Sequence, residues 1–186
     1  DEVVTKPALQ RDRLQEFITD PQTAGKKILN RYRVIHTSGT TGKPAIFVYG
    51  QREWNIVKAL AITRVSKTPL NPFHRSRLAF VGATGGHYAG VSLANDAPKF
   101  LFKILTLSIN EPLPLLVDEL NIFNPSSLSG YASGLYLLAL EKRQGTLQIR
   151  PGRIISSGDM LLPHMSRAIG DAFGVDYHLF DNSESF

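Results

Sequence analysis

The stretch "RYRVIHTSGTTGKPAIFVYG", residues 31–50, places hydroxyl-bearing residues, glycines and one lysine between two apolar segments. Both segments are short and rich in β-branched and aromatic residues, which predicts a strand on either side of the loop. Glycines let backbone N–H groups approach an anion closely, and Lys43 adds a mobile positive charge. The stretch therefore predicts a strand–loop–strand unit that holds a polyphosphate, although its composition also fits a solvated hairpin loop.

The loop differs from the P-loop of nucleotide hydrolases. That motif, G-x-x-x-x-G-K-[ST], joins a strand to a helix. Here only Thr40 and Thr41 separate Gly39 from Gly42, and a proline follows Lys43. The loop is also expected to join two strands. A phosphate-loop NTPase is therefore disfavoured.

Length and composition restrict the classes of protein. A chain of 186 residues can bury a sizeable core, and it has no cysteine for disulfides, thiolate metal sites or a nucleophile. We expect the reducing cytoplasm and no membrane span, because no apolar run approaches the ~20 residues required. The chain begins with neither Met nor a leader, so we expect a segment of a longer chain. The net charge of +5 fits a phosphate-bearing small molecule, whereas no RNA-binding signature indicates nucleic acid.

The remainder of the chain alternates between short apolar segments and helical patterns. The expected strands after the first loop are Leu78 to Val81, 102–109, 127–131, the start of 153–159, and 175–180. The expected helices are one capped by Thr5 and ending at Asp20, then 53–65, 113–123, 133–143 and 163–174. This alternation predicts an α/β fold with a mainly parallel sheet and flanking helices.

Polar loops follow several of these strands. They are "GATGGHY" (82–88), "SSGD" (156–159) and "DNSES" (181–185). Ligands of parallel α/β sheets bind beyond the carboxyl ends of the strands, so we expect these loops to converge on one site. Glu184 beside Asn182 and Ser183 fits Mg²⁺ binding, and it also fits a solvated turn. His87 fits a residue that lines a pocket or acts as an acid–base group, and it also fits a structural residue.

Two other kinds of site are excluded by spacing. His36, His74, His164 and His178 do not have the spacing of metal ligands, so no zinc site is expected. The serines do not form the G-x-S-x-G elbow of α/β-hydrolases.

Taken together, the loops resemble those of the adenylate-forming (AMP-binding) superfamily of acyl-CoA synthetases. "TSGTTGKP" (37–44) matches the phosphate loop of that superfamily nearly residue for residue. "SGYASGLYLLALE" followed by "GRIISSGDML" resembles its helix and adenine-side loop, and "YHLFDNSESF" is similar to its aromatic-Gly-x-Ser/Thr-Glu motif. "GGHYAG" (85–90) points to the phenylacetate–CoA ligase-like branch, which includes capsular-polysaccharide and coenzyme F390 synthetase relatives.

The resemblance implies a reaction. Such enzymes join a carboxylic acid to ATP, giving an acyl-adenylate and pyrophosphate, and then transfer the acyl group to a thiol or another nucleophile. It implies ATP and Mg²⁺ as cofactors and CoA as the default acceptor, with a carrier-protein thiol or an amine as alternatives. Some relatives are homodimers. The protein mainly positions the reactants and neutralises developing charge.

The resemblance also implies roles for individual residues. Thr40, Lys43 and Glu184 would take part in catalysis, with Glu184 as the Mg²⁺ ligand. His87 and Tyr88 would border the acyl pocket. The β- and γ-phosphates would be held by Thr37, Ser38, Gly39, Thr40, Thr41, Gly42 and Lys43. The remaining nucleotide contacts would come from Ser157, Gly158 and Asp159 beside the adenine, Phe180 stacked on it, and Asp181, Asn182 and Ser183, with Ser183 near the α-phosphate.

Two residues depart from the pattern of the superfamily. Asp181 stands where Gly is usual, and its side chain would crowd the adenine or repel phosphate; Asp159 stands where Glu is more common. The ribose-binding Asp and the C-terminal domain with its catalytic Lys would lie beyond Phe186. We therefore expect residues 1–186 to be a single partial adenylation domain, part of the large N-terminal domain, with little ligase activity alone. The alternative is a non-catalytic nucleotide-binding or assembly protein that retains the fold.

Overall fold

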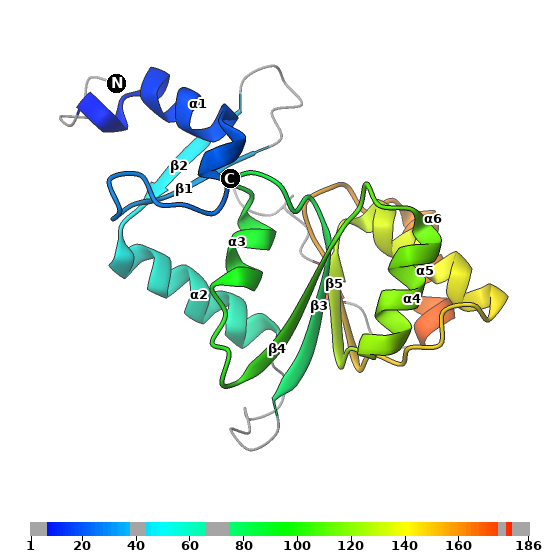
Figure 1. The fold of residues 1–186 in the computed structure, drawn as a ribbon. Helices are drawn as coiled ribbons and strands as arrows, with labels where there is room; N and C mark the ends of the chain where they lie inside the picture. Colours follow the sequence, from blue (N-terminus) through cyan, green and yellow to red (C-terminus); the bar gives the residue numbers. More distant parts are fainter. Residues whose placement is uncertain (1–6, 38–43, 66–74, 175–177, 180–186) are drawn as a thin grey trace.

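The computed structural model describes residues 7–37, 44–65, 75–174 and 178–179, in which helices and strands alternate along the chain (Figure 1). The strands are β1 (Arg33–His36), β2 (Ile46–Tyr49), β3 (Ser76–Gly82), β4 (Phe102–Ser108), β5 (Ser127–Gly130), β6 (Arg153–Ser156) and β7 (His178–Leu179). The α-helices are α1 (Arg11–Thr19), α2 (Gln51–Val65), α3 (Ala89–Asn95), α4 (Leu113–Phe123), α5 (Ala132–Gln144) and α6 (Pro163–Phe173). Two 3₁₀-helices, η1 (Pro7–Leu9) and η2 (Pro21–Thr23), flank α1.

The strands form two sheets. β1 and β2 make an antiparallel hairpin, in which Arg33 pairs with Tyr49 and His36 with Ile46. The other strands form a five-stranded sheet in the order β4–β3–β5–β6–β7, and every neighbouring pair is parallel. The predicted α/β fold with a mainly parallel sheet and flanking helices is confirmed. The strands expected on both sides of the first loop are also confirmed.

The side chains of β3 point alternately to the two faces of the parallel sheet, and both faces are covered. Successive side chains of a strand point to opposite faces, and all of Ala79, Phe80 and Val81 are buried. Phe80 packs with residues of α3, whereas Ala79 and Val81 pack with α4, α5 and α6. Figure 1 shows these three helices on one side of the sheet and α3 on the other. The larger core cluster lies under α4–α6 and contains Leu116, Val117, Leu120, Leu128, Leu135, Leu138, Leu147, Ile154 and Ile169.

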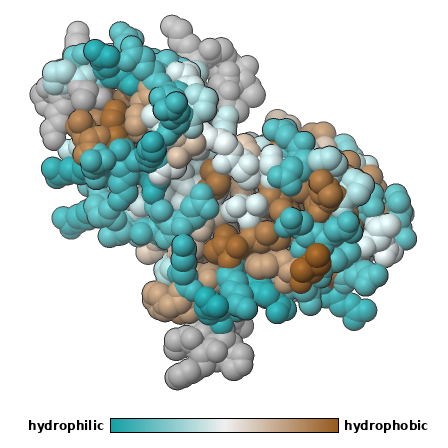
Figure 2. Space-filling view, viewed as in Figure 1, coloured by the Kyte–Doolittle hydropathy of each residue, from teal (hydrophilic) through white to brown (hydrophobic). Residues whose placement is uncertain are grey.

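The surface differs between the two parts of the molecule. Hydrophilic residues cover most of the visible face around α1 and α2, and hydrophobic residues gather near α4 (Figure 2). Leu115 and Ile122, both on α4, are exposed. Among the described helices, none combines the length and the hydrophobicity that crossing a membrane requires.

Two local predictions differ from the structure. The first helix was expected to start at a Thr5 cap, which lies outside the described residues. α1 instead starts at Arg11, because Gln10 has an extended backbone (φ −67°, ψ 153°) that separates α1 from η1. α3 was not predicted. It has seven residues, includes Gly90, and receives no side-chain cap from Tyr88, so it lacks the usual sequence signals of a helix.

Candidate functional site

Thr37 closes the base of the first loop. Its backbone N–H donates to the carbonyl oxygen of Ala45 (3.0 Å), and its Oγ1 accepts a hydrogen bond from the backbone N–H of Ala45 (3.0 Å). This predicted phosphate contact is therefore engaged in holding the two ends of the loop together. The other predicted residues of the loop, 38–43, lie outside the described residues.

The base of the first loop lies against the β3–α3 loop. The backbone N–H of His36 donates to the carbonyl oxygen of His87 (3.0 Å), and the His36 ring lies 4.5 Å from the ring of Tyr88. His36 Nδ1 is also 2.9 Å from the carbonyl oxygen of Thr37. Two segments predicted to contribute to one site are thus in direct contact. His36 was considered only as a metal ligand, and its packing role carried no signal in the sequence.

His87 and Tyr88 differ in their surroundings. The His87 side chain is 1% exposed, its Nε2 lies 3.0 Å from Thr23 Oγ1, and its ring lies 4.8 Å from the ring of Phe17. It packs toward α1 and η2. Tyr88 is half-buried and packs in an apolar cluster that contains Phe80, Val91 and Ala94. Of the two residues predicted to border the acyl pocket, Tyr88 lies beside the end of β3, and the His87 ring does not.

The contacts of His87 determine its protonation state. The Thr23 hydroxyl has carbonyl acceptors on Phe17 and Asp20, so its hydrogen is used there and its oxygen accepts from His87 Nε2–H. His87 Nδ1 is buried and has no hydrogen-bond partner among the described residues. Burial lowers the pKa of His87 most, followed by the positive charges of His36 and Arg33. The lowered pKa favours the neutral imidazole of His87 at pH 7.

Tyr131 connects Tyr88 with the loop 157–159. Tyr131 follows β5 and belongs to the same apolar cluster as Phe80 and Tyr88. Gly158 has φ +89°, and a Cβ atom there would lie 2.6 Å from Tyr131 Cε1. Both the backbone conformation and the lack of space require glycine at this position. Burial raises the pKa of the Tyr131 hydroxyl. The Tyr131 ring therefore lies directly on the backbone of the loop 157–159.

Asp159 caps helix α5. Its Oδ1 accepts a hydrogen bond from the backbone N–H of Ala132, and its Oδ2 accepts from Ser133 N (3.1 Å) and Ser133 Oγ (2.7 Å). The backbone N–H of Ser157 donates to the carbonyl oxygen of Gly130 (2.9 Å). A carboxylate at a helix N-terminus satisfies free backbone donors and complements the helix dipole. Asp159 thereby fixes the loop 157–159 at the carboxyl end of β5.

The last predicted segment follows β7. Leu179 pairs with Ser156, so β7 ends beside β6 at the edge from which Ser157 leaves. Phe180, Asp181, Asn182, Ser183 and Glu184 lie outside the described residues. Within the part of the chain that the structure describes, no group of three His, Asp or Glu side chains could hold a metal ion.

Comparisons with known proteins identify the fold. No family model matches the chain, and no curated protein does. Several solved ligases do match. An open conformation of 2-hydroxyisobutyryl-CoA ligase with 2-HIB-AMP and CoA is 22% identical over 80% of this chain and 33% of that one, with a TM-score of 0.58. The anthranilate CoA ligase AuaEII with anthranoyl-AMP is 17% identical over 77% of this chain and 27% of that one (TM-score 0.52).

A third match concerns a part of an enzyme. The N-terminal subdomain of Klebsiella oxytoca NpsA, in complex with anthranilyl-AMSN, is 20% identical over 78% of this chain and 36% of that one (TM-score 0.51). The chain spans about a third of the length of the solved structures it matches. At these identities the likeness establishes the fold alone, and the predicted α/β fold is shared with these solved ligases.

Proposed function

We propose that this chain belongs to an adenylate-forming acid–thiol ligase, which uses ATP to activate a carboxylic acid as an acyl-adenylate and releases pyrophosphate. One observation carries the proposal. The base of the first loop, Tyr88, Tyr131 and the loop 157–159 form a contiguous row at the carboxyl edge of the parallel sheet. Two solved ligases that share this fold, 2-hydroxyisobutyryl-CoA ligase and AuaEII, contain an acyl-AMP.

In the proposed reaction, this row of residues borders the nucleotide. The carboxylate of the acid attacks the α-phosphorus of ATP, the bond to the β-phosphate oxygen breaks, and pyrophosphate leaves. The first loop, 37–43, holds the β- and γ-phosphates, with Thr40 and Lys43 neutralising charge as pyrophosphate departs. Ser157, Gly158 and Asp159 border the adenine on the side where Tyr131 packs.

The segment after β7 would complete the nucleotide site. Phe180 stacks on the adenine and Ser183 bonds near the α-phosphate. Glu184 would hold Mg²⁺, because a single carboxylate suits this ion, which takes most of its ligands from phosphate and water. Asn182 and Asp181 would lie between Phe180 and Ser183 beside the nucleotide, where the Asp181 side chain replaces the usual Gly.

The acyl acceptor we propose is CoA, because two matching structures of 2-hydroxyisobutyryl-CoA ligase contain it. A carrier-protein thiol is the alternative. The loop sequence at 85–90 supports the phenylacetate–CoA ligase-like branch.

Substitution of the first loop tests this function. We expect Thr40→Ala with Lys43→Ala to raise the KM for ATP by about tenfold or more, because charge-assisted phosphate contacts are lost. The measurement is carboxylate-dependent ATP–pyrophosphate exchange by the longest natural polypeptide that contains residues 1–186. The control is Lys99→Ala, an exposed lysine after α3. An unchanged KM in the double variant, with its fold intact, contradicts the proposed phosphate contacts.

A further inference from the structure

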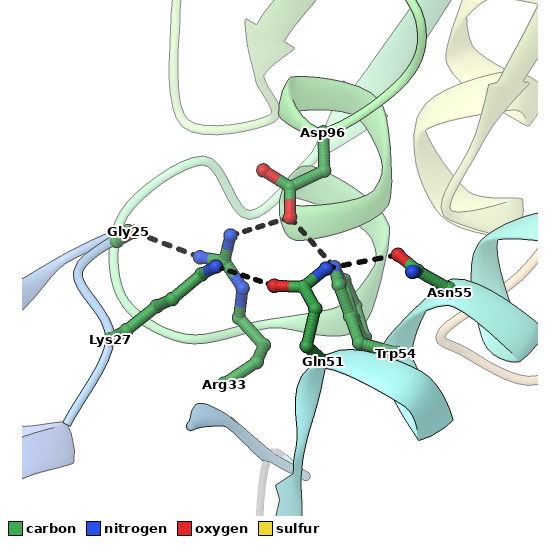
Figure 3. A network of polar contacts seen from close by, with 7 residues as sticks. All are labelled: Gly25, Lys27, Arg33, Gln51, Trp54, Asn55 and Asp96. Atoms are coloured by element: carbon green, nitrogen blue, oxygen red, sulfur yellow. Dashed lines mark hydrogen bonds and ion pairs between the residues drawn. The ribbon is translucent and has the colours of Figure 1, made fainter. Parts of the chain in front are cut away.

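An ion pair between buried Arg33 and partly exposed Asp96 joins the hairpin to helices α2 and α3. The Arg33 side chain on β1 is buried; its Nη1 donates to the carbonyl oxygen of Gly25 (2.8 Å) and its Nη2 to Asp96 Oδ2 (2.5 Å). The same carboxylate oxygen accepts a hydrogen bond from Trp54 Nε1 (2.7 Å). Figure 3 shows the Asp96 carboxylate above Arg33 and Trp54, with Gln51 bridging to Lys27 and Asn55 beside them.

Contacts on several sides hold the Arg33 guanidinium, although its buried Nε has no hydrogen-bond partner among the described residues. The guanidinium carbon of Arg33 lies 5.6 Å from the centre of the Trp54 ring. The ring therefore restricts the guanidinium on a third side. Removing a charge from water is costly, and a buried pair recovers that cost only where geometry and hydrogen bonding are good. Buried pairs are therefore weak evidence of stability, and a network of this kind is better explained by what it holds in place.

The network lies in the two segments that meet at the candidate site. Arg33 begins the strand that ends at His36, immediately before Thr37. Asp96 follows α3, which begins directly after Tyr88. The hairpin is thus attached to the segment 87–96 at two points, by the His36–His87 backbone hydrogen bond and by the Arg33–Asp96 pair. Two attachments fix the direction of β1, whereas one would allow it to pivot.

We propose that Arg33 and Asp96 are a positioning pair, which fixes the direction in which β1 carries the first loop to the nucleotide site. The inference rests on the proposed function. Neither residue touches the nucleotide; they act through β1 and Thr37. Trp54 supports the pair by orienting the Asp96 carboxylate.

The test removes the negative charge of Asp96 and keeps the shape of its side chain. Asp96→Asn retains an acceptor for Trp54 and removes the negative charge opposite Arg33. We expect the KM for ATP in pyrophosphate exchange to rise about tenfold, with kcat within about twofold of the wild-type value, because the loop is misplaced for binding while the reacting groups are unaltered. The assay again uses the longest natural polypeptide that contains this sequence.

A second substitution tests whether Arg33 and Asp96 act as one unit. If the two side chains act as one unit, Arg33→Gln combined with Asp96→Asn is no worse than Asp96→Asn alone, since the buried cation is gone. Where Asp96→Asn fails to fold, Trp54→Phe keeps the ion pair and the ring but removes the indole N–H. We expect Trp54→Phe to raise the KM for ATP by about twofold to threefold.

The exposed ion pair between Arg13 and Glu16 on α1 supplies the matched control (2.9 Å). Glu16→Gln should leave the KM for ATP unchanged, because an exposed pair constrains little. Suppose that the wild-type protein catalyses exchange and that folded Asp96→Asn has an unaltered KM for ATP. This result overturns the positioning pair alone, and the same result in folded Trp54→Phe does so where Asp96→Asn does not fold. Absence of exchange in the wild-type protein overturns the proposed function, and this inference with it.

Discussion

Among single residues, buried His87 makes the free energy of unfolding depend on pH. The pKa of His87 is lowered in the folded protein, chiefly by burial, relative to the ordinary value of 6.5. As pH falls through 6.5, the unfolded chain therefore binds a proton before the folded chain does. The free energy of unfolding then decreases with falling pH, because the unfolded state binds more protons. The contribution of neutral His87 to the free energy of unfolding is present above pH 6.5. It is lost as the pH falls through the lowered pKa of His87 in the folded chain.

His87→Gln tests this pH dependence. The glutamine amide retains an N–H donor for Thr23 but does not titrate. We expect the wild-type chain to lose more stability between pH 7 and pH 5 than His87→Gln does, measured by urea unfolding at both values. The control is His164→Gln, which alters an exposed histidine on α6 and should keep the wild-type pH dependence. The same loss in His87→Gln as in wild type would show that another group is responsible.

Among the helices, α5 depends on a cap from outside its own sequence. Its N-cap residue, Tyr131, makes no side-chain cap hydrogen bond. The donors at its start are instead satisfied by Asp159, which lies 27 residues after Ala132 in the chain. The end of α5 follows the usual pattern, with Lys142 and Arg143 in the last turn and Gly145 in the left-handed conformation. The cap therefore couples the stability of α5 to the position of the loop 157–159.

Asp159→Ala should lower the free energy of unfolding by about 0.5–2 kcal/mol, the usual effect of removing a helix cap. Asp118→Ala, at an exposed position on α4, should stay within about 0.5 kcal/mol of wild type. Urea unfolding of the three chains at pH 7 measures both effects. Equal stability of the two variants would show that Asp159 does not support α5.

The elements that could be predicted are those whose patterns are local. Apolar runs such as "LAFVG" and helical spacings such as that of α4 identify β3 and α4 directly. The carboxyl ends of parallel strands share one edge, so the convergence of the loops after β3 and β6 also followed from the sequence. α3 could not be predicted, because its seven residues gain their helical structure from packing against Phe80.

In the whole molecule, the unpredicted features join residues that are distant in the chain. The Asp159 cap, the contact of His87 with Thr23 and the Arg33–Asp96 pair each connect segments separated by 27 to 64 residues. A single sequence carries no pairing information for such contacts. One signal was present for Arg33, since a charged residue in the middle of "RYRVIH" becomes buried only if it has a partner.

At the scale of the whole molecule, we propose that the hairpin and the parallel sheet together hold ATP for reaction with a carboxylic acid. The most direct measurement is ATP–pyrophosphate exchange by the longest natural polypeptide that contains residues 1–186, with a panel of aryl and fatty acids and a reaction without acid. We predict exchange that depends on at least one acid. A folded protein that binds Mg-ATP but catalyses no exchange with any acid would contradict the claim and support a non-catalytic nucleotide-binding protein.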